Sequence, residues 1–233
     1  MNSLFDGKYM ISVIPDICQA LPLTLYMLVL VMFFGLIVGF LLAAMRIKGN
    51  KIVASISALY VSFTRGIPEL VQLLLVYYLI PDLLEKIGIP SSSWSKTIFA
   101  VTAFSLGNAA YLSETLRSAY LSVPVGQHEA AASIGMTGWQ AFRRIILPQA
   151  VSVAIPNISN TVIIVLKNLS IGFSIGVTEI LGKTKLISAA SFGSKNLECY
   201  MAAAIIYCVI CLLMERVLAA FETIFRKGRK NYA

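Results

Sequence analysis

The chain has 233 residues, of which 58% are hydrophobic and only 13% are charged, with a mean hydropathy of +0.81 and a net charge of +8. Soluble domains carry about 25% charged residues, so this composition excludes an ordinary soluble domain and predicts an all-α, polytopic membrane protein. The positive charge does not indicate nucleic-acid binding, because the basic residues stand beside apolar segments, where they orient a membrane protein. The four cysteines lack paired spacing and a neighbouring histidine, so neither a metal site nor a disulfide framework is expected.

Five apolar segments are long enough to be transmembrane helices. A bilayer core of ~30 Å requires about 20 predominantly apolar residues in a helix. The first segment contains no charged side chain at all. We interpret the five segments as one transmembrane domain over residues 1–233. The predicted spans are residues 17–45, 52–80, 97–120, 150–166 and 199–221.

Basic residues predict the direction in which these spans cross the cell membrane. With five spans, three basic clusters fall on one side, and the positive-inside rule makes that side cytoplasmic. The N-terminus is then outside and the C-terminus inside. Lys183, Lys185 and Lys195 fall on the outer side and weaken this bias without reversing it. The three cytoplasmic clusters are Arg46, Lys48 and Lys51; Arg143 and Arg144; and Arg226, Lys227, Arg229 and Lys230.

The second span is interrupted by the sequence Arg-Gly-Ile-Pro-Glu at residues 65–69. Glycine and proline at this place predict a kink or a fresh helix start. A new helix would direct its free N–H groups and the positive end of its dipole toward an anionic ligand group. The alternative is a packed structural kink in which Arg65 is held by a carbonyl group or by Glu69.

The third span carries polar residues at three-residue intervals, namely Asn108, Tyr111, Glu114 and Arg117. A charged side chain at the centre of a bilayer costs ~2.5–3.5 kcal/mol on insertion scales, so each one requires a partner or a function. One interpretation is that Glu114 and Arg117, which have the spacing of an ion pair, pair with each other or anchor the helix end. The other is that Asn108 and Tyr111, together with Glu114, face a central polar cavity.

The fourth span contains Asn160 and ends at Lys167, and the residues after it, which include Ser170, are rich in turn formers. Non-helical backbone at membrane depth occurs only where protein buries it or where it lines a water-filled cavity. Lys167 is therefore interpreted either as a carboxylate ligand or as a side chain that extends to the outer surface. Residues 176–184 are similar to a phosphate-binding loop, but five residues separate the glycines where four are needed. No ATPase site is expected in this chain.

A polar loop rich in small residues, about residues 124–148, separates the third and fourth spans. Seven of its positions match the spacing Glu-Ala-Ala-x3-Gly-x9-Ile-x-Leu-Pro, and the loop resembles the EAA loop of ABC importer membrane subunits. In that family the loop forms a short coupling helix that docks into a separate ATP-hydrolysing subunit. The resemblance assigns ATPase coupling to Gly126, Glu129, Ala130, Ala131 and Gly135.

The resemblance extends over about residues 20–225. Residues 63–72 resemble the "FRGTPLLVQ" segment of permeases that take up polar amino acids such as histidine, glutamine, arginine and cystine, and residues 108–117 resemble their "saAYxxExxRg" stretch. Residues 170–183 are most similar to the cystine-type members. At residues 167–170 the chain has Lys-Asn-Leu-Ser where the family usually has Lys-Asp-Thr-Ser, so a carboxylate and a hydroxyl are missing there.

The resemblance to such permeases implies a type I importer, in which two membrane subunits pair as a homodimer or as a heterodimer. Separate ATP-binding subunits hold ATP and Mg, an external binding protein delivers the amino acid, and the membrane subunits move it by alternating access. This chain is then a transport subunit of the cytoplasmic membrane with no catalytic residue, metal or cofactor of its own. The candidate residues of the substrate cavity are Asn108, Tyr111, Glu114, Arg65, Asn160, Lys167 and Ser170.

Two other functions are consistent with parts of this pattern. An importer of the same architecture could carry another small solute, such as a sulfonate, a metal chelate or a short peptide. An ion-coupled secondary carrier or channel belongs to a different class. Secondary carriers commonly show inverted repeats with paired broken helices, whereas this chain has one strong break and no partner half.

Overall fold

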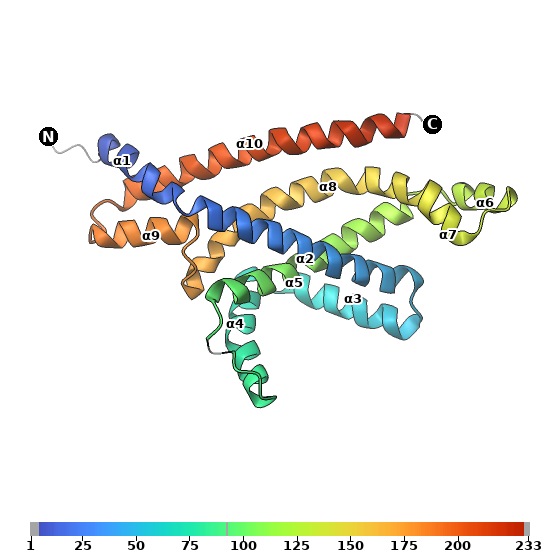
Figure 1. Cartoon of the computed structure of the whole chain (residues 1–233), viewed down its shortest axis with the longest axis horizontal. Helices are drawn as coiled ribbons and strands as arrows, with labels where there is room; N and C mark the ends of the chain where they lie inside the picture. The colour runs from blue at the N-terminus through green and yellow to red at the C-terminus, as the bar shows by residue number, and fades with distance from the viewer. Residues whose placement is uncertain (1–4, 92, 231–233) are drawn as a thin grey trace. The chain divides into compact units, whose positions relative to one another are not determined.

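A computed structural model describes residues 5–91 and 93–230, without the side chains of residues 225–230. Every regular element in this part of the chain is a helix (Figure 1), which confirms the predicted all-α class. The side chains of the last predicted basic cluster, Arg226 to Lys230, lie outside the described residues. In chain order the helices are α1 (Gly7–Cys18), α2 (Leu21–Lys48), α3 (Lys51–Gly66), α4 (Glu69–Lys86), α5 (Lys96–Leu121), α6 (Val125–Ser133), α7 (Gly138–Ala141), the π-helix η1 (Phe142–Ile146), α8 (Leu147–Asn168), the 3-10 helix η2 (Leu169–Ile175), α9 (Ile180–Ala190) and α10 (Asn196–Lys230).

The chain packs into two compact units, each built from segments that are distant in the sequence. Each of the four long helices is divided between the units, with one part in unit 1 and the other in unit 2. These helices are α2, α5, α8 and α10. The prediction of a single transmembrane domain concerns the chain as a whole and stays a prediction. Unit 1 comprises residues 1–33, 67–105 and 163–214, and unit 2 comprises residues 34–66, 106–162 and 215–233.

Several helices have the length and composition of membrane spans. Within the described residues, three helical stretches are long and apolar enough to cross a membrane: Leu21–Lys48, Gly138–Ile175 and Asn196–Ile224. Helices α3 and α4 meet the same criterion only as a pair, which is bent by 110° at the predicted break. Helix α5 has 26 residues, enough for a span, but its polar positions make it less apolar. The predicted count of five spans stays a prediction.

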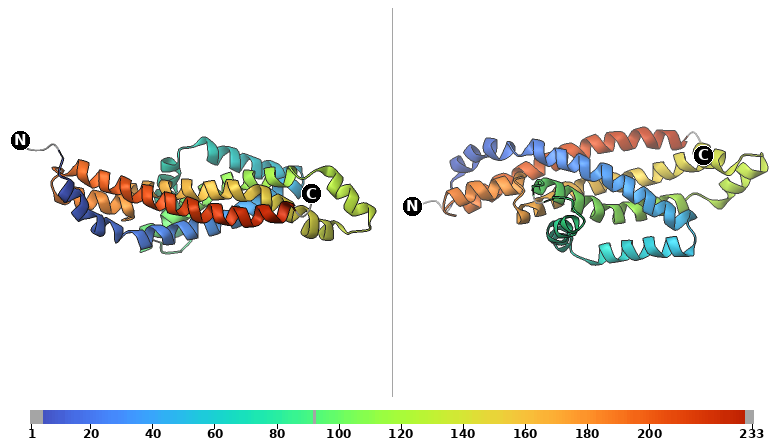
Figure 2. Two further views of the ribbon diagram at one scale, coloured as in Figure 1. Left: turned by 90° about the horizontal axis from the view of Figure 1, so that it is seen from above. Right: turned by 60° about the horizontal axis from the view of Figure 1, so that its bottom comes forward.

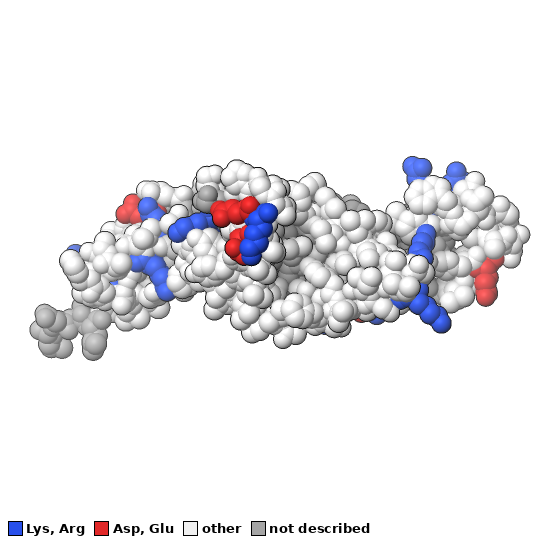
Figure 3. Space-filling view, turned by 90° about the horizontal axis from the view of Figure 1, so that it is seen from below, with Lys and Arg blue, Asp and Glu red and all other residues white. Residues whose placement is uncertain are grey.

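The start of the first span differs from the prediction. The first span was expected to begin at residue 17, but α1 ends at Cys18 and α2 begins at Leu21. The physical reason is Pro22, which lacks an N–H group and is favoured in the first turn of a new helix. The fresh helix start predicted within the second span is confirmed, because α4 begins directly after Pro68. Figure 3 shows a face on which charged side chains are few and stand in small groups, as expected for a membrane protein.

In unit 1 the short helix α1 is buried against α9 and the first part of α10. Val13 and Ile17 of α1 form a hydrophobic cluster with Ile180 of α9 and with Ala202 and Ile206 of α10. Helical spacing of four residues places each pair on one face of its helix. The cluster explains why a helix of 12 residues, too short to be stable alone, holds a defined position in this unit.

Residues 176–184, which are similar to a phosphate-binding loop, form a helix cap. Glu179 is fully buried at the N-terminus of α9, where its carboxylate accepts hydrogen bonds from the N–H groups of Leu181 (3.0 Å) and Gly182 (2.8 Å). The hydroxyl of Tyr207 donates a third bond, of 2.8 Å, to the same carboxylate. A capping carboxylate satisfies N–H groups that have no partner within the helix. These contacts account for Glu179, the acidic residue of this segment.

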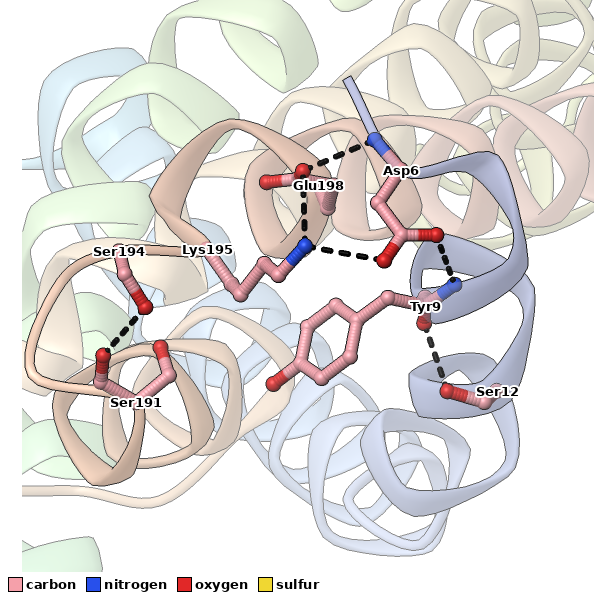
Figure 4. Close-up of polar contacts among 7 residues, drawn as sticks. All are labelled: Asp6, Tyr9, Ser12, Ser191, Ser194, Lys195 and Glu198. Carbon is pink, nitrogen blue, oxygen red and sulfur yellow. Dashed lines mark hydrogen bonds and ion pairs between the residues drawn. The ribbon is translucent and has the colours of Figure 1, made fainter. Parts of the chain in front are cut away.

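An ion-pair cluster, which we call the N-terminal clasp, joins the start of α1 to the start of α10 (Figure 4). Lys195 lies between two acidic groups, with its ammonium nitrogen 2.9 Å from Asp6 and 3.7 Å from Glu198. The Asp6 N–H also donates to Glu198 at 3.0 Å. Hydrogen bonds from the Tyr9 backbone N–H and the Lys195 ammonium lower the pKa of Asp6, and the bond to Asp6 raises the pKa of Lys195. Asp6, Lys195 and Glu198 thus connect residues that are distant in the sequence.

In unit 2 the second part of α2 packs tightly against α5. A Cβ atom placed on Gly39 would lie 3.0 Å from the Ala109 carbonyl oxygen and 3.0 Å from Leu112 Cβ, so a larger residue would force the helices apart. Gly39 therefore permits close contact between the two helices. The Ser57 hydroxyl of α3 donates to the Leu42 carbonyl of α2 at 2.9 Å. Helices α6 and α7 project beyond the ends of α5 and α8 that they connect (Figures 1 and 2).

Candidate functional site: the coupling segment and the helix break

The predicted coupling loop, residues 124–148, forms two short helices, and we call it the coupling segment. Helix α6 begins after Pro124 and ends in a left-handed turn at Gly135, where φ is +79°. The Gly135 N–H donates to the Ala132 carbonyl at 2.9 Å, and the Met136 N–H donates to the Ala131 carbonyl at 3.0 Å. This pair of bonds is the Schellman motif, which favours glycine at the left-handed position. Gly135 therefore ends α6 in a turn that its residue type favours.

The second half of the coupling segment begins with a capped helix, α7. Thr137 and Gln140 form a capping box at the start of α7: the Gln140 N–H donates to the Thr137 hydroxyl at 3.3 Å, and the Thr137 N–H donates to the Gln140 side chain at 2.9 Å. The chain then passes through the π-helix η1 directly into α8. The reciprocal cap satisfies two N–H groups at once, so the turn between α6 and α7 is specified by local chemistry.

A small hydrophobic cluster anchors the coupling segment to the ends of α5 and α8. Val123, Ile146 and Ala150 are its buried members, with Tyr120 and Phe142 packed against them. The ring of Tyr120 also contacts His128 of α6, at 6.1 Å between centroids in an edge-on arrangement. Of the predicted coupling residues, Ala131 faces inward and is 1% exposed. Gly126, Glu129, Ala130 and Gly135 are exposed, as a surface that binds a partner requires.

Three large apolar side chains of the coupling segment are also exposed, and the sequence reasoning did not single them out. The exposed fractions are 70% for Val125, 74% for Ile134 and 65% for Trp139. Single exposed apolar residues are common, but a group on one projecting segment is typical of an interaction surface. Their signal was present in the sequence, because each interrupts an otherwise polar loop.

An apolar cavity of about 200 Å³ lies in unit 2 beside the coupling segment. Phe40 and Ile47 of α2, Leu116 of α5, Trp139 of α7 and Phe142 of η1 are among its lining residues. Lys48 lies over the Phe142 ring at 5.0 Å from its centroid. Because the lining is almost entirely apolar, this cavity does not have the polar groups that a polar amino acid would require.

The polar face of α5 is occupied by cations from α2 and α3. The Arg117 guanidinium donates to the Glu114 carboxylate at 2.6 Å, which confirms the predicted pairing, and Arg46 of α2 bonds the other carboxylate oxygen. Arg65 lies over the Tyr111 ring at 5.5 Å, and no bond from it to a carbonyl group or to Glu69 is seen in the described residues. Asn108 is 6% exposed and thus buried. Their assignment to a substrate cavity, together with that of the exposed Asn160 on α8, stays a prediction.

A second polar site lies in unit 1, where the helix break meets the end of α8. No side chain in the described residues caps the N-terminus of α4 after Pro68. The Glu69 carboxylate accepts a hydrogen bond from the Asn168 side chain, and its Oε2 atom is buried without a partner in the described part of the chain. Lys167 is exposed and Ser170 half-buried, both beside Asn168. The pairing of Glu69 with Asn168 was not predicted, because about a hundred residues separate the two in the sequence.

Comparison with known proteins identifies the family. Residues 35–227 match the family model described as the inner membrane component of binding-protein-dependent transport systems. The chain belongs to this family. It is 41% identical over 227 residues to the probable amino-acid permease protein YxeN of Bacillus subtilis (strain 168), covering 97% of this chain and 98% of that protein.

Two further similarities narrow the class. The chain is 41% identical over 229 residues to the L-cystine transport system permease protein TcyL of Bacillus subtilis (strain 168), covering 98% of this chain and 95% of the relative. A crystal structure of an amino acid ABC transporter with histidines has a chain with a TM-score of 0.82 and 30% identity, covering 94% of this chain and 98% of that one. The chain is thus a membrane permease of the amino-acid ABC importer class with the type I fold, as the resemblance predicted.

Proposed function

We propose that the permease forms the translocation path for a polar amino acid in an importer driven by separate ATP-binding subunits, which hold ATP and Mg. A second permease, either another copy or a related chain, completes the path, and an external binding protein delivers the substrate. The observation that carries this proposal is the projecting coupling segment, whose exposed face combines the predicted coupling residues with Val125, Ile134 and Trp139. A surface of this kind requires a soluble partner.

The coupling segment is suited to transmit force from such a partner. Helix α6 is short and stiff, its C-terminal turn is hydrogen-bonded, and its buried residue Ala131 fixes it to unit 2. ATP binding closes the ATP-binding subunits, the coupling helices follow, and the membrane path opens to the outside. Glu129 lies on the exposed face of α6 and contacts the ATP-binding subunit in this proposal.

Charge reversal at Glu129 tests the coupling role. In the complex assembled with its ATP-binding subunit in lipid vesicles, Glu129→Lys should abolish ATP hydrolysis stimulated by substrate and binding protein while the permease still inserts. Ser133→Ala, also on the exposed part of α6, serves as the matched control, because its hydroxyl bonds only within the helix, to the Glu129 carbonyl at 2.9 Å. Unchanged ATP turnover in the Glu129→Lys complex would remove Glu129 from the coupling surface.

The helix break in unit 1 supports recognition of an amino acid at that place. An amino acid carries an ammonium group and a carboxylate, and the site offers a partner of opposite charge to each. The Glu69 carboxylate has one buried oxygen without a partner in the described residues, and an ammonium group could pair with it when the path opens. The uncapped N-terminus of α4 suits a carboxylate through its free N–H groups and dipole, and Lys167 supplies a positive charge on the neighbouring segment.

Neutralising Glu69 tests this recognition. A hydrogen bond to a charged group contributes about 1.5–3 kcal/mol, so Glu69→Gln should raise the KM for uptake at least about tenfold. Glu85→Gln, on the exposed far end of the same helix, is the matched control. A KM equal to that of the wild type in both variants would exclude Glu69 from the path.

In unit 2, Asn108→Leu should weaken uptake without preventing assembly. Normal uptake kinetics in this variant would exclude Asn108 from the substrate cavity.

L-cystine is the substrate we propose. The likeness to a cystine permease and the cystine-type sequence of residues 170–183 support it. The test is ATP-dependent uptake of labelled L-cystine into vesicles that contain the complete transporter, in competition with unlabelled cystine, glutamine and arginine. Cystine should compete at the lowest concentration. Stronger competition by glutamine or arginine would assign the importer to another polar amino acid.

The proposed orientation places the N-terminus outside and the C-terminus in the cytoplasm. Basic residues beside the spans support it, and it places the coupling segment on the side where ATP is available. A tag at the N-terminus should react with a membrane-impermeant reagent added to intact cells. Labelling only after the cells are opened would overturn the orientation and the count of five spans.

A further inference from the structure

In unit 2 one carboxylate is bonded by two arginines from different turns and helices. Glu114 of α5 bonds Arg46 of α2 through one oxygen and accepts a hydrogen bond of 2.6 Å from Arg117 through the other. The side chains of Arg46, Glu114 and Arg117, which we call the charge clamp, are between 20% and 28% exposed. The Nε atom of Arg117 is buried and has no partner in the described residues. The single carboxylate of Glu114 therefore neutralises the charges of both arginines.

Polar contacts also join α3 to both of its neighbours in this unit. The Tyr60 hydroxyl donates to the Leu106 carbonyl of α5 at 2.9 Å, and Arg65 lies over the ring of Tyr111. The Ser57 hydroxyl bonds the Leu42 carbonyl of α2. Helices α2, α3 and α5 are thus linked pairwise, and the charge clamp provides the link between α2 and α5.

The clamp prevents a movement that apolar packing permits. Hydrophobic contact is non-directional, so two apolar helix faces can slide along each other at little cost. A slip of one helical turn, about 5.4 Å, would take Arg46 away from Glu114. Gly39 keeps the two backbones close, and the ion pair fixes their register along the helix axes. Close approach and fixed register together make α2 and α5 move as one body.

The linked helices α2, α3 and α5 lead to two different features of the chain, the coupling segment and the helix break. Helix α5 leads through residues 122–124 into α6 of the coupling segment, so a push on α6 acts directly on α5. Helix α3 ends at Gly66, immediately before the helix break. We propose that Arg46, Glu114 and Arg117 are positioning residues that transmit displacement of the coupling segment from α5 to α2 and α3, and so to the helix break. This inference rests on the proposed ATP-driven function.

The test measures how many amino-acid molecules enter vesicles per ATP hydrolysed by the complete transporter. Arg46→Met is the principal variant, because it removes the link from α2 while Glu114 keeps its bond to Arg117, so the clamp carries no unpaired anion. ATP hydrolysis should continue, while uptake per ATP should fall at least about 5-fold, the lower end of the usual range for coupling between sites. Arg46→Lys, which keeps the charge, should retain most of the coupling.

Two further variants separate transmission from stability. The exchange Arg46→Glu with Glu114→Arg rebuilds the clamp with the anion on α2, and it should recover uptake per ATP relative to Glu114→Arg alone. Asp82→Asn breaks an exposed ion pair with Lys86, of 2.7 Å, on α4 and should leave the ratio unchanged. Co-purification of the ATP-binding subunit with each variant reports assembly.

Each outcome bears on a different statement. A wild-type complex that imports no amino acid with ATP would overturn the proposed function itself. If the wild-type complex imports the amino acid and the assembled Arg46→Met complex imports as many molecules per ATP as the wild type, only the proposed role of the charge clamp is overturned. Failure of the exchanged pair to recover, in a complex that assembles, would likewise contradict a link made by charge.

Discussion

Each unit contains one cluster of three charges, and the two clusters have opposite compositions. The N-terminal clasp of unit 1 places the cation Lys195 between Asp6 and Glu198, whereas the charge clamp of unit 2 places the anion Glu114 between Arg46 and Arg117. The clasp joins the start of α1 to the start of α10, and the clamp joins the last turn of α2 to the C-terminal part of α5. The chemistry is alike, so the difference in surroundings decides what each cluster does.

The two clusters differ in solvent access. In the clasp, Lys195 and Asp6 are 32% and 43% exposed, and surface ion pairs of this kind add little stability, whereas Glu198 is only 6% exposed. The charges of the clamp are 20–28% exposed, and Glu114 is the only counter-charge that the described residues offer to Arg46 and Arg117, so removal of Glu114 leaves two uncompensated cations. We therefore expect the clasp to order the end of the chain and the clamp to determine whether unit 2 holds together.

The largest expected effect comes from removing the anion of the clamp. Breaking a buried ion pair lowers the free energy of unfolding by about 3–5 kcal/mol. The loss in Glu114→Leu should be somewhat smaller than this, because the Glu114 side chain is 27% exposed. Thermal unfolding of the purified permease in detergent should show a clear fall in Tm. Phe34→Leu, also in unit 2 but uncharged, serves as the control for an ordinary substitution. A Tm equal to that of the wild type would show that the clamp contributes nothing.

An intermediate effect is expected at the cap of α9. Glu179→Ala removes the acceptor for two N–H groups and for the Tyr207 hydroxyl. Loss of a cap costs about 0.5–2 kcal/mol, and the orphaned hydroxyl adds to it. Tyr207→Phe, which removes only the hydroxyl, should lower the Tm less. Equal losses in the two variants would mean that the cap itself contributes little, and unit 1 would then depend on apolar packing.

A smaller effect is expected when the clasp is broken. Lys195→Met should raise the hydrogen-exchange rate of α1 while the Tm of the whole permease changes little. High salt should act similarly on the wild type, because the Debye length falls from ~10 Å at 0.1 M to ~3 Å at 1 M salt. The exchange rate in Lys195→Met should then be insensitive to salt. Lys8→Met is the matched control on the same helix, and a salt response equal to that of the wild type in Lys195→Met would refute the role of the clasp.

The smallest effect is the pH dependence of the clasp. The pKa of Asp6 is lowered in the folded chain, so its contribution is complete above its ordinary value of ~3.9 and is lost as pH falls through the lowered pKa. The pKa of Lys195 is raised, so its contribution is complete below its ordinary value of ~10.4 and is lost as pH rises through the raised pKa. Protection of α1 should therefore be constant from about pH 5 to 9. A transition within this range would show that another group controls α1.

Local chemistry explains most of what could be predicted for the coupling segment and the helix break. The spacing from Glu129 to Pro148 identified the segment, and Gly135 takes the left-handed turn that its residue type favours. Gly66 and Pro68 end one helix and start another within a few residues. These features depend on neighbours in the chain, so a sequence pattern is sufficient to find them.

Partners distant in the sequence could not be predicted in the same way. Glu114 was expected to pair with Arg117, one turn away, and it does, but its bond to Arg46 crosses 68 residues. One of the two interpretations of the break placed Arg65 at a carbonyl group or at Glu69, and Arg65 lies over the ring of Tyr111. In the same way Glu69 bonds Asn168, a residue noted in the sequence only for lacking a carboxylate.

By itself the sequence determined that this protein crosses a membrane, that it is helical, where its backbone breaks and which segment forms an exposed helix between two spans. Periodicity, hydropathy and turn chemistry are properties of consecutive residues and survive without any fold. Only the tertiary structure decided which charge neutralises which, because a buried ion takes its partner from whichever helix lies within a few ångströms, and that neighbour is set by packing rather than by order along the chain.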